Sequence, residues 1–216
     1  MEIITSEDFH HICFQKDSTL LKTTYDRPKL LETPAGEMVK IFYPRRKRFS
    51  SNSFKPYAIR FKANANRLRQ LGFAAPHVEN IKFCPDLRTY ILIYQKIPGE
   101  NARILANQNM DIIAAVAKYL VELHHQGIFF RSLHLENLLY QETEEFLLLD
   151  IVDVKFKKNP LNIFFRYRNL KHMFFIEDDA TFWQSYGIEK FVEQYLKLAK
   201  LSRLSTYILK RMLKQK

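Results

Sequence analysis

Residues 127–150, which read GIFFRSLHLENLLYQETEEFLLLD, constrain the fold more than any other part of the chain. They contain a polar loop and two short apolar runs, 138–140 and 146–149, separated by an acidic turn. Two such runs joined by a short turn predict a β-hairpin. The hairpin would bring Asn137, in the loop, close to Asp150, at the end of the second run. Two oxygen ligands facing one cleft suit Mg²⁺, which completes its shell with water and phosphate.

The loop also resembles a known catalytic motif. Protein kinases carry H-R-D-L-x-x-x-N, then a hairpin and the metal-binding Asp of D-F-G. Here FRSLHLEN over residues 130–137 fills the first frame, and DIV over residues 150–152 stands in place of D-F-G. His134 is similar to the His of the D-L-H-x-x-N loop of small-molecule kinases. The chain resembles the bacterial lipopolysaccharide-core kinases (Kdo and heptose kinases, including toluene-tolerance-type members) over residues 15 to 175.

This resemblance implies an α+β, two-lobed protein-kinase-like fold, with a small antiparallel β-sheet lobe at 1–97 and a mainly helical lobe at 98–216. It implies ATP and Mg²⁺ as cofactors and transfer of phosphate to a sugar hydroxyl, in the manner of lipopolysaccharide biosynthesis. The site residues that it implies are catalytic (Arg131, Ser132, His134 and Asp153), nucleotide-binding (Lys40, Gln95, Ile97, Asn137 and Asp150) and metal-binding (Asn137 and Asp150).

The chain departs from the kinase pattern in four places. Ser132 replaces the catalytic Asp, and Phe130 replaces the His of the motif. No G-x-G-x-x-G loop separates the first two predicted strands, and no acidic residue lies in the predicted helix at 53–72 to pair with Lys40. The alternative is therefore a pseudokinase-like protein that binds a nucleotide, a phosphoglycan or a protein without turnover. Asp153, Glu136 or His134 would have to replace the missing base in an enzyme.

The N-terminal half has the alternating pattern of an antiparallel sheet. Runs at 20–25, 29–33 and 38–42, with turns at 26–28 and 34–37, predict three strands, and 78–83 and 89–94 predict two more. Lys40 lies on the third strand, where the kinase lysine would be, although an outward-facing lysine fits the pattern equally. Gln95, Lys96 and Ile97 follow the last strand, where a kinase hinge would present backbone groups to a purine.

The C-terminal half is expected to be helical. Apolar residues at helical spacing predict a buried helix at 110–126, with His124 and His125 as cations at its C-terminal end. An aromatic and basic helix is expected at 160–175. One helix is predicted from 180 to about 201, with 177–179 capping it, and a last basic helix at 203–216.

Composition limits the remaining possibilities. With 47% hydrophobic residues the chain can bury a sizeable core, and its charge of +11 favours an anionic partner. The basic stretches 45–48 and 203–216 fit an anionic glycolipid or phosphosugar acceptor and peripheral contact with the inner membrane, or simply a solvated surface. No nucleic-acid-binding module is recognisable. The sequence shows no signal peptide, zinc spacing or membrane span, so a cytoplasmic protein is expected. The oligomeric state stays open.

Overall fold

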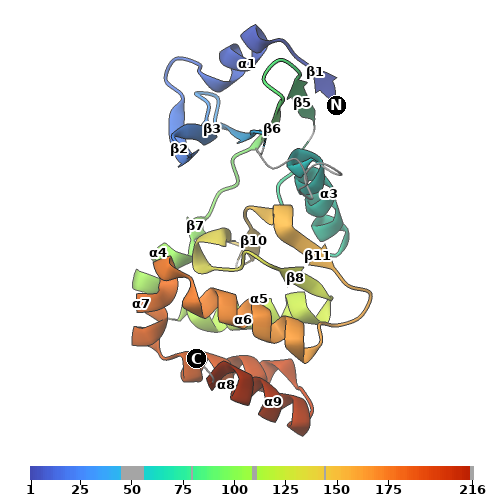
Figure 1. Cartoon of the computed structure of the whole chain (residues 1–216). Helices are drawn as coiled ribbons and strands as arrows, with labels where there is room; N and C mark the ends of the chain where they lie inside the picture. The colour runs from blue at the N-terminus through green and yellow to red at the C-terminus, as the bar shows by residue number, and fades with distance from the viewer. Residues whose placement is uncertain (45–55, 79, 109–110, 144, 215–216) are drawn as a thin grey trace. The chain divides into compact units, whose positions relative to one another are not determined.

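The computed structural model describes residues 1–44, 56–78, 80–108, 111–143 and 145–214. The chain divides into two compact units (Figure 1). The N-terminal unit comprises Met1–Gln70 and Ala75–Pro98, and the C-terminal unit comprises Leu71–Ala74 and Gly99–Lys216. The first is built on a sheet and the second is mostly helical, so the predicted α+β class with a sheet unit followed by a mainly helical unit is confirmed.

Six strands of the described chain form the sheet of the N-terminal unit, in the order β1-β5-β6-β4-β3-β2. Their bounds are β1 (Glu2–Ile3), β2 (Thr19–Thr24), β3 (Arg27–Glu32), β4 (Glu37–Phe42), β5 (Ile81–Cys84) and β6 (Thr89–Gln95). All neighbours are antiparallel except β1 and β5. The five strands expected from the sequence are therefore present, and β1 adds an edge strand that the sequence reading did not include.

The first turn lies earlier than predicted. The sequence placed it at 26–28, but Arg27 and Pro28 already pair with β2, and the turn consists of Tyr25 and Asp26. Both residues have positive φ, 50° and 59°, which is the geometry of a tight hairpin turn whose twist matches that of the strands. A two-residue turn of this kind leaves no extended loop between β2 and β3.

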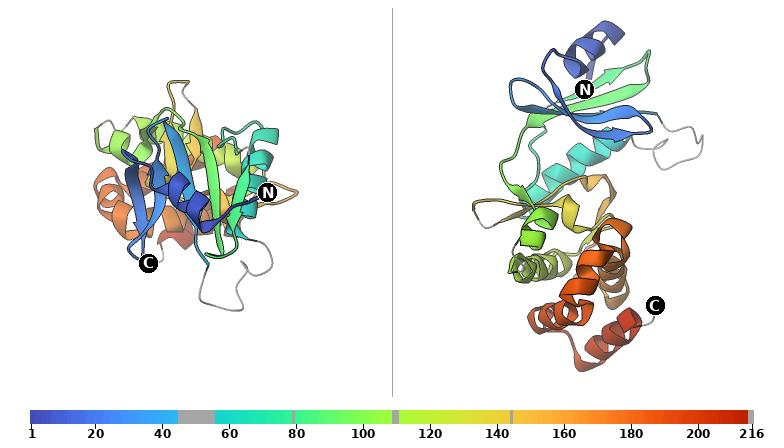
Figure 2. Two further views of the ribbon diagram at one scale, coloured as in Figure 1. Left: turned by 90° about the horizontal axis from the view of Figure 1, so that it is seen from above. Right: turned by 90° about the vertical axis from the view of Figure 1, so that its left-hand side faces the viewer.

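Helices α1 (Ser6–Cys13) and α3 (Tyr57–Gln70) cover opposite faces of this sheet, as Figure 2 shows. Successive residues of a strand point to opposite faces. Val39 and Ile41 of β4 therefore share a core with Phe9 and Cys13 of α1. The alternate face of β4 carries Phe42, which contacts Phe61 of α3 at 6.2 Å between ring centroids. Lys40 lies on this second face.

The C-terminal unit contains helices α4 (Ala102–Gln108), α5 (Ile112–His125), α6 (Ile163–Phe175), α7 (Glu177–Tyr186), α8 (Ile188–Ala199) and α9 (Arg203–Lys214). Its short strands are β7 (Glu100–Asn101), β8 (Ile128–Phe130), β9 (Leu138–Tyr140), β10 (Phe146–Leu148) and β11 (Val154–Phe156). They form two small sheets, β10-β9-β7 and β11-β8. Helix α4 is an element that the sequence analysis did not predict.

The predicted helix at 180–201 is wrong, because the structure has two helices there. Gly187 separates α7 from α8 with φ at +93°, a conformation that glycine adopts readily and that ends a helix. The break lets Trp183 of α7 pack against Phe191 of α8 and Phe174 of α6, at 5.1 Å between ring centroids in each pair. These three fully buried rings form the centre of the helical core.

The expectation that His124 is a C-terminal cation is also wrong. His124 is 1% exposed, and burial, followed by the positive charge of Arg166, lowers its pKa to about 3. Its Nδ1 lies 2.7 Å from the Tyr195 hydroxyl and its Nε2 lies 3.2 Å from Oδ1 of Asn169. Neutral His124 thus satisfies both ring nitrogens inside the core. His125 is exposed and lies 3.3 Å from the Ala199 carbonyl.

Candidate functional site

The polar loop begins where α5 ends. Gly127 has φ at +71°, and a Cβ there would lie 2.6 Å from the carbonyl oxygens of Lys157 and Asn159, so only glycine fits this exit from the helix. The chain then forms β8, which pairs with β11, and turns at Arg131 and Ser132. A single 3₁₀ turn, η1 (Leu135–Asn137), leads into β9.

The predicted hairpin is confirmed. Strands β9 and β10 are antiparallel, with Tyr140 opposite Phe146 and Leu138 opposite Leu148. At the site end, the Leu149 amide donates to the Asn137 carbonyl at 2.8 Å. Asp150 follows directly, so the structure brings the backbone of Asn137 and the start of Asp150 together, as the sequence predicts.

The side chain of Asn137 is oriented by the loop itself. It is 5% exposed, and its amide nitrogen donates to the Ser132 carbonyl at 2.8 Å. With the nitrogen used in this bond, the remaining polar atom of the side chain is Oδ1, an acceptor. Asp150 has φ at +48°, a left-handed conformation that a residue other than glycine seldom adopts and that occurs often at functional sites.

These two residues fit Mg²⁺ by the chemistry of their donors. One amide oxygen and one carboxylate are hard oxygen ligands, and Mg²⁺ is commonly held by one or two protein oxygens together with water and phosphate. The described residues contain no group of three or more His, Cys, Asp or Glu side chains that could hold a metal ion. Asn137 and Asp150 could therefore hold a metal only together with ligands from outside the protein, such as water and phosphate.

A buried carboxylate from another helix fixes the loop. Asp179 of α7 is 0% exposed and accepts from the Leu135 amide at 2.8 Å and from Nε of Arg103 at 2.6 Å. Arg103 of α4 also lies 3.3 Å from the carboxylate of Glu136. Asn101 donates to the Glu136 carbonyl at 2.6 Å. The 3₁₀ turn is thus held by charge-assisted bonds on both sides, which are stronger than neutral ones.

A second buried network lies beneath β8. Asn169 of α6 donates to the Phe130 carbonyl at 2.6 Å, and its Oδ1 accepts from His124. Tyr195 donates to His124 and accepts from Arg166 at 2.7 Å. Arg166 also donates to the Leu161 carbonyl at 2.7 Å. The strand that leads into the loop is therefore anchored to α5, α6 and α8.

The remaining candidate residues of the loop lie within the same unit. His134 precedes η1 and is half-buried; its pKa is lowered mainly by burial, although Asp179 and Glu136 oppose this effect. Its buried Nδ1 has no hydrogen-bond partner among the described residues. A neutral imidazole with an unshared nitrogen can accept a proton.

Strand register brings Arg131 and Asp153 to the same end of one strand pair. Phe130 pairs with Val154 in β8 and β11, so Arg131 and Asp153 leave this strand pair at the same end. Arg131 is exposed, and its charge adds to burial in lowering the pKa of His172 on α6. Ser132 is half-buried. Arg131, Ser132 and Asp153 therefore lie at the same end of the β8–β11 strand pair.

Lys40 lies in the N-terminal unit, on the face of β4 that α3 covers. It is 6% exposed, and its ammonium nitrogen lies 5.0 Å from the Phe61 ring centroid and 5.9 Å from that of Phe42. The alternative of an outward-facing strand lysine is therefore wrong. Helix α3 presents the ring of Phe61 to this lysine, whereas the kinase pattern leads one to expect a carboxylate on this helix.

The predicted hinge residues begin at the last residue of β6. Gln95 ends the strand opposite Glu37. The Lys96 amide donates to the Gly36 carbonyl at 3.3 Å, and its Nζ lies 2.9 Å from Glu32. Ile97 is half-buried. The N-terminal unit ends at Pro98, one residue beyond the boundary at 97 inferred from the sequence.

Of the two basic stretches, 45–48 and 203–216, the structure describes only the second, as far as residue 214. Residues 45–48 lie outside the described residues. Helix α9 is anchored by the fully buried Leu209 and leaves Leu204 and Tyr207 exposed by 69% and 61%. No helix of the described chain has the length and apolar character required to cross a membrane.

Sequence reasoning missed the residues that support the loop. The sequence predicts only a helix-capping role for Asp179 and indicates no role for Arg103 or Asn169. Three acidic residues at the start of a helix are an ordinary N-terminal signal. One signal distinguishes Asp179 from Asp178. Asp179 lies four residues before Trp183, so the two side chains share one face of the helix, and this is the buried face.

Proteins similar to this chain are found among solved structures. No family model and no curated protein matches it. Among solved structures it is similar to WbdD, with 14% identity and a TM-score of 0.49, over 91% of this chain and 50% of the other. A second WbdD structure, described as a bifunctional kinase-methyltransferase, has 15% identity and a TM-score of 0.45, covering 82% of this chain and 45% of the other. The chain thus spans about half the length of these structures.

Proposed function

We propose that this chain is an ATP- and Mg²⁺-dependent phosphotransferase of the lipopolysaccharide-core kinase type, acting on a sugar hydroxyl. The observation that carries the proposal is the bond from the Leu149 amide to the Asn137 carbonyl, 2.8 Å long, which sets Asp150 next to the Asn137 loop. Phosphoryl transfer requires mainly positioning and neutralisation of charge, and a rigid pair of oxygen ligands suits that requirement.

The proposed roles follow from the chemistry of each side chain. Mg²⁺, when bound, neutralises the charge of the transferring phosphoryl group. Asn137 and Asp150 would hold it, and Lys40 would bind the nucleotide phosphates. Backbone groups of Gln95 and Ile97 would contact the purine. Arg131, exposed at the edge of the loop, would bind the phosphate or an anionic acceptor.

The proton of the acceptor hydroxyl needs a base other than Ser132, whose hydroxyl is a weak base at neutral pH. A general base contributes about 10²–10⁴-fold to the rate. Asp153 is one candidate, because it precedes β11 at the end of the β8–β11 pair where Arg131 follows β8. His134 is the other, because burial lowers its pKa and keeps it neutral. Glu136 is less suited, because its carboxylate lies 3.3 Å from Arg103.

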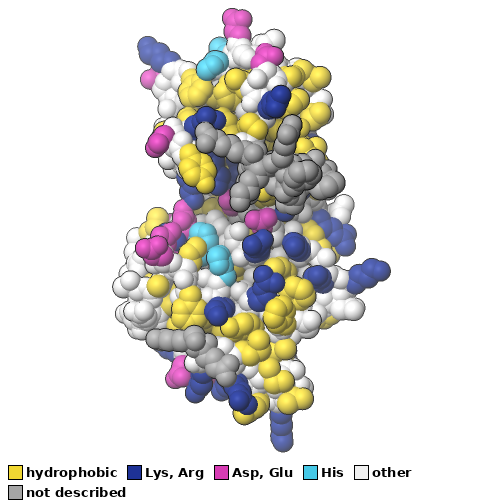
Figure 3. Space-filling view, viewed as in Figure 1, with side chains coloured by type: hydrophobic (Ala, Val, Ile, Leu, Met, Phe, Trp, Pro, Cys, Tyr) yellow, Lys and Arg dark blue, Asp and Glu magenta, His cyan; other side chains and the backbone are white. Residues whose placement is uncertain are grey.

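The acceptor that we propose is an anionic glycolipid or phosphosugar. Figure 3 shows Lys and Arg side chains next to hydrophobic ones on the surface of the C-terminal unit. The guanidinium of Arg168 lies 5.7 Å from the Phe129 and Phe164 ring centroids, and Lys157 lies 4.5 Å from that of Phe165. Phe164 is 51% exposed. Such a surface would attract phosphate groups and an apolar lipid chain, including those of the inner-membrane surface.

A pseudokinase-like scaffold is the second candidate function, and two observations favour it. The β2–β3 turn consists only of Tyr25 and Asp26, which leaves no glycine loop to cover phosphates. Lys40 packs at 5.0 Å from the Phe61 ring, an arrangement that holds an ammonium group without a nucleotide. In this reading the chain would bind a nucleotide, glycan or protein without turnover.

Replacement of Ser132 distinguishes the two functions. The measurement is Mg²⁺-dependent release of ADP from ATP by the wild type, Ser132→Asp and Asp150→Ala. If the chain is an enzyme, Ser132→Asp raises the rate and Asp150→Ala abolishes it, because the first supplies a carboxylate base and the second removes a metal ligand. Equal inactivity of all three folded proteins would contradict the enzyme and leave the scaffold.

A further inference from the structure

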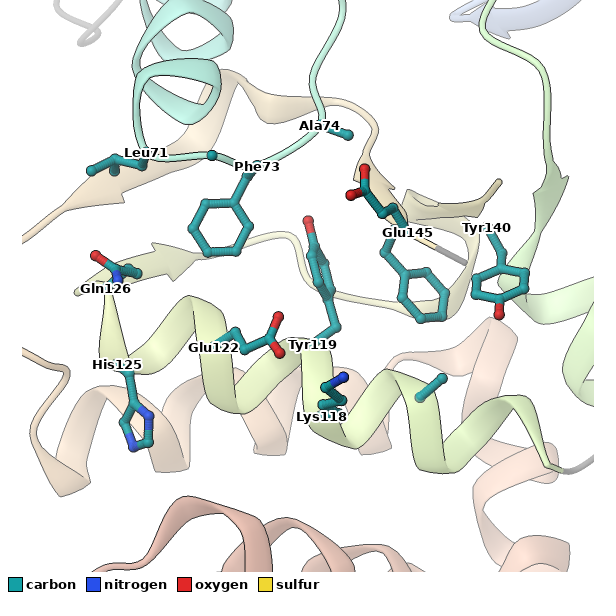
Figure 4. A pocket seen from close by; sticks show the side chains of 13 residues that line it. Leu71, Phe73, Ala74, Lys118, Tyr119, Glu122, His125, Gln126, Tyr140 and Glu145 are labelled. Atoms are coloured by element: carbon teal, nitrogen blue, oxygen red, sulfur yellow. The ribbon is translucent and has the colours of Figure 1, made fainter. Parts of the chain in front are cut away.

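The C-terminal unit contains a cavity of about 660 Å³ away from the candidate loop. Figure 4 shows it between α5 below and residues 71–74 above, with the hairpin at one side. Ala74 forms a parallel bridge with Leu147 of β10, so residues 71–74 are attached to the hairpin. The cavity lies at the turn end of the hairpin, two residues from the Leu138–Leu148 pair, or about 7 Å along the strand.

A continuous aromatic wall lines the cavity. Phe73 lies 5.9 Å from Tyr119, Tyr119 lies 5.3 Å from Phe146, and Phe146 lies 4.9 Å from Tyr140, measured between ring centroids. The four rings come from three separate segments of the chain. The faces of aromatic rings carry negative electrostatic potential, and such a wall attracts cations.

The Tyr119 hydroxyl lies inside this wall. Tyr119 is 7% exposed, and its oxygen has no hydrogen-bond partner among the described residues. Figure 4 shows the hydroxyl pointing from α5 toward the space beside Phe73. A buried hydroxyl without a hydrogen bond destabilises the folded chain. A ligand that donates to this oxygen would remove that destabilisation.

Two carboxylates add negative charge around the hydroxyl. Burial raises the pKa of Tyr119, and the charges of Glu122 and Glu145 raise it further. The phenol therefore stays neutral, and both carboxylates act on it electrostatically. Both also line the cavity, together with Lys118. His125 directs its ring away, toward the Ala199 carbonyl on the other side of α5.

We propose that this cavity binds an alkylammonium ion, with its N–H groups donating to the Tyr119 hydroxyl and to Glu122 or Glu145, and its methylene groups against the aromatic wall. The ligand is a free primary amine or the side chain of a lysine. An anion would face two carboxylates against one lysine. A neutral ligand would gain no charge attraction from the two carboxylates. The proposal is independent of phosphotransfer, because none of these residues belongs to the candidate loop.

Binding of 1,4-diaminobutane to the full chain, measured by calorimetry, tests the proposal. The second probe is Nα-acetyl-lysine methylamide, which keeps the side-chain amine free. The neutral control is 1-butanol and the anionic control is glutarate. The amine should bind and both controls should not. Binding of the diamine alone identifies a free amine as the ligand, and equal or tighter binding of the lysine derivative identifies a lysine side chain. Absence of binding by both amines would overturn the proposal.

Variants of the wall locate the binding. Glu122→Gln and Glu145→Gln should each weaken amine binding about fivefold, since partly exposed ion pairs contribute at most about 1 kcal/mol. Glu193→Gln on α8, a carboxylate outside the cavity, is the matched control and should bind as the wild type does. Equal affinity of all three variants and the wild type would refute the assignment.

A stability measurement gives a second readout. Without amine, Tyr119→Phe should unfold at the same temperature as the wild type or higher, because it deletes a buried hydroxyl that has no partner. With amine, the wild type should gain thermal stability and Tyr119→Phe should gain clearly less. A lower unfolding temperature for Tyr119→Phe without amine would show that the hydroxyl already has a strong partner, and would contradict the proposal.

Discussion

The buried His124 makes the stability of the C-terminal unit depend on pH. The folded chain holds the ring neutral, with its pKa lowered to about 3 by burial and by Arg166. In the unfolded chain a histidine has a pKa of about 6.5. The pKa is lower in the folded state, so at pH values between 3 and 6.5 His124 binds more protons in the unfolded chain than in the folded chain. The free energy of unfolding is therefore highest above pH 6.5 and falls as the pH is lowered toward 3.

The magnitude follows from this difference in proton binding. Between pH 7 and pH 5 the folded histidine stays neutral while the unfolded one becomes almost fully protonated, which lowers the free energy of unfolding by about 2 kcal/mol. His134 and His172 also have a pKa lowered by burial and contribute with the same sign. The contribution of His124 is thus the difference between the wild type and a variant that lacks its imidazole.

The assay is urea unfolding of the wild type and His124→Gln at pH 7, 6 and 5. Fluorescence of Trp183 follows the C-terminal unit, because Trp183 is the chain's single tryptophan and is fully buried there. His124→Gln should be less stable at pH 7 and should lose about 2 kcal/mol less than the wild type on going to pH 5. His125→Gln, at an exposed neighbour, is the control. Equal losses in the wild type and His124→Gln would refute a neutral, buried His124.

Three further predictions concern stability and surface charge. Gly127→Ala should lower the unfolding temperature more than Gly72→Ala. Both glycines have positive φ, which costs alanine about 1–2 kcal/mol. A Cβ at position 127 would also lie 2.6 Å from two carbonyl oxygens, whereas a Cβ at position 72 meets nothing within 4 Å. Asp179→Asn should lower the free energy of unfolding by about 2–4 kcal/mol. Asp178→Asn, at a side chain 61% exposed, should change it by less than about 0.5 kcal/mol. Sedimentation with anionic liposomes should fall steeply as salt rises, because charges are screened within about 8 Å at physiological salt; salt-independent sedimentation would contradict a role for basic α9.

The local parts of the fold could be predicted from the sequence. The β9–β10 hairpin, the five longer strands of the N-terminal sheet and the buried α5 follow from apolar period and turn residues that lie within a few positions of one another. The proximity of Asn137 and Asp150 follows from the hairpin alone. These predictions are confirmed because each depends on a short segment whose residue pattern is compatible with only one local structure.

Contacts between distant segments could not be predicted. Asp179 bonds Leu135 and Arg103, which lie 44 and 76 residues away in the sequence, and nothing in the first turn of α7 indicates these partners. His124 looked like a helix-end cation because its partners, Tyr195 and Asn169, lie on helices much later in the chain. A buried polar side chain is recognised only when the partner that satisfies it is known.

The central claim, that Asn137 and Asp150 hold Mg²⁺ with a nucleotide, is tested most directly by binding of ATP. Calorimetric titration of ATP should be made with Mg²⁺ and with EDTA, for the wild type, Asp150→Ala and the control Glu193→Gln. We predict that ATP binds the wild type and the control only with Mg²⁺, and that Asp150→Ala loses the part of the affinity that depends on the metal. ATP binding that is tight and unchanged by EDTA and by Asp150→Ala, or absent from the wild type altogether, would contradict the claim.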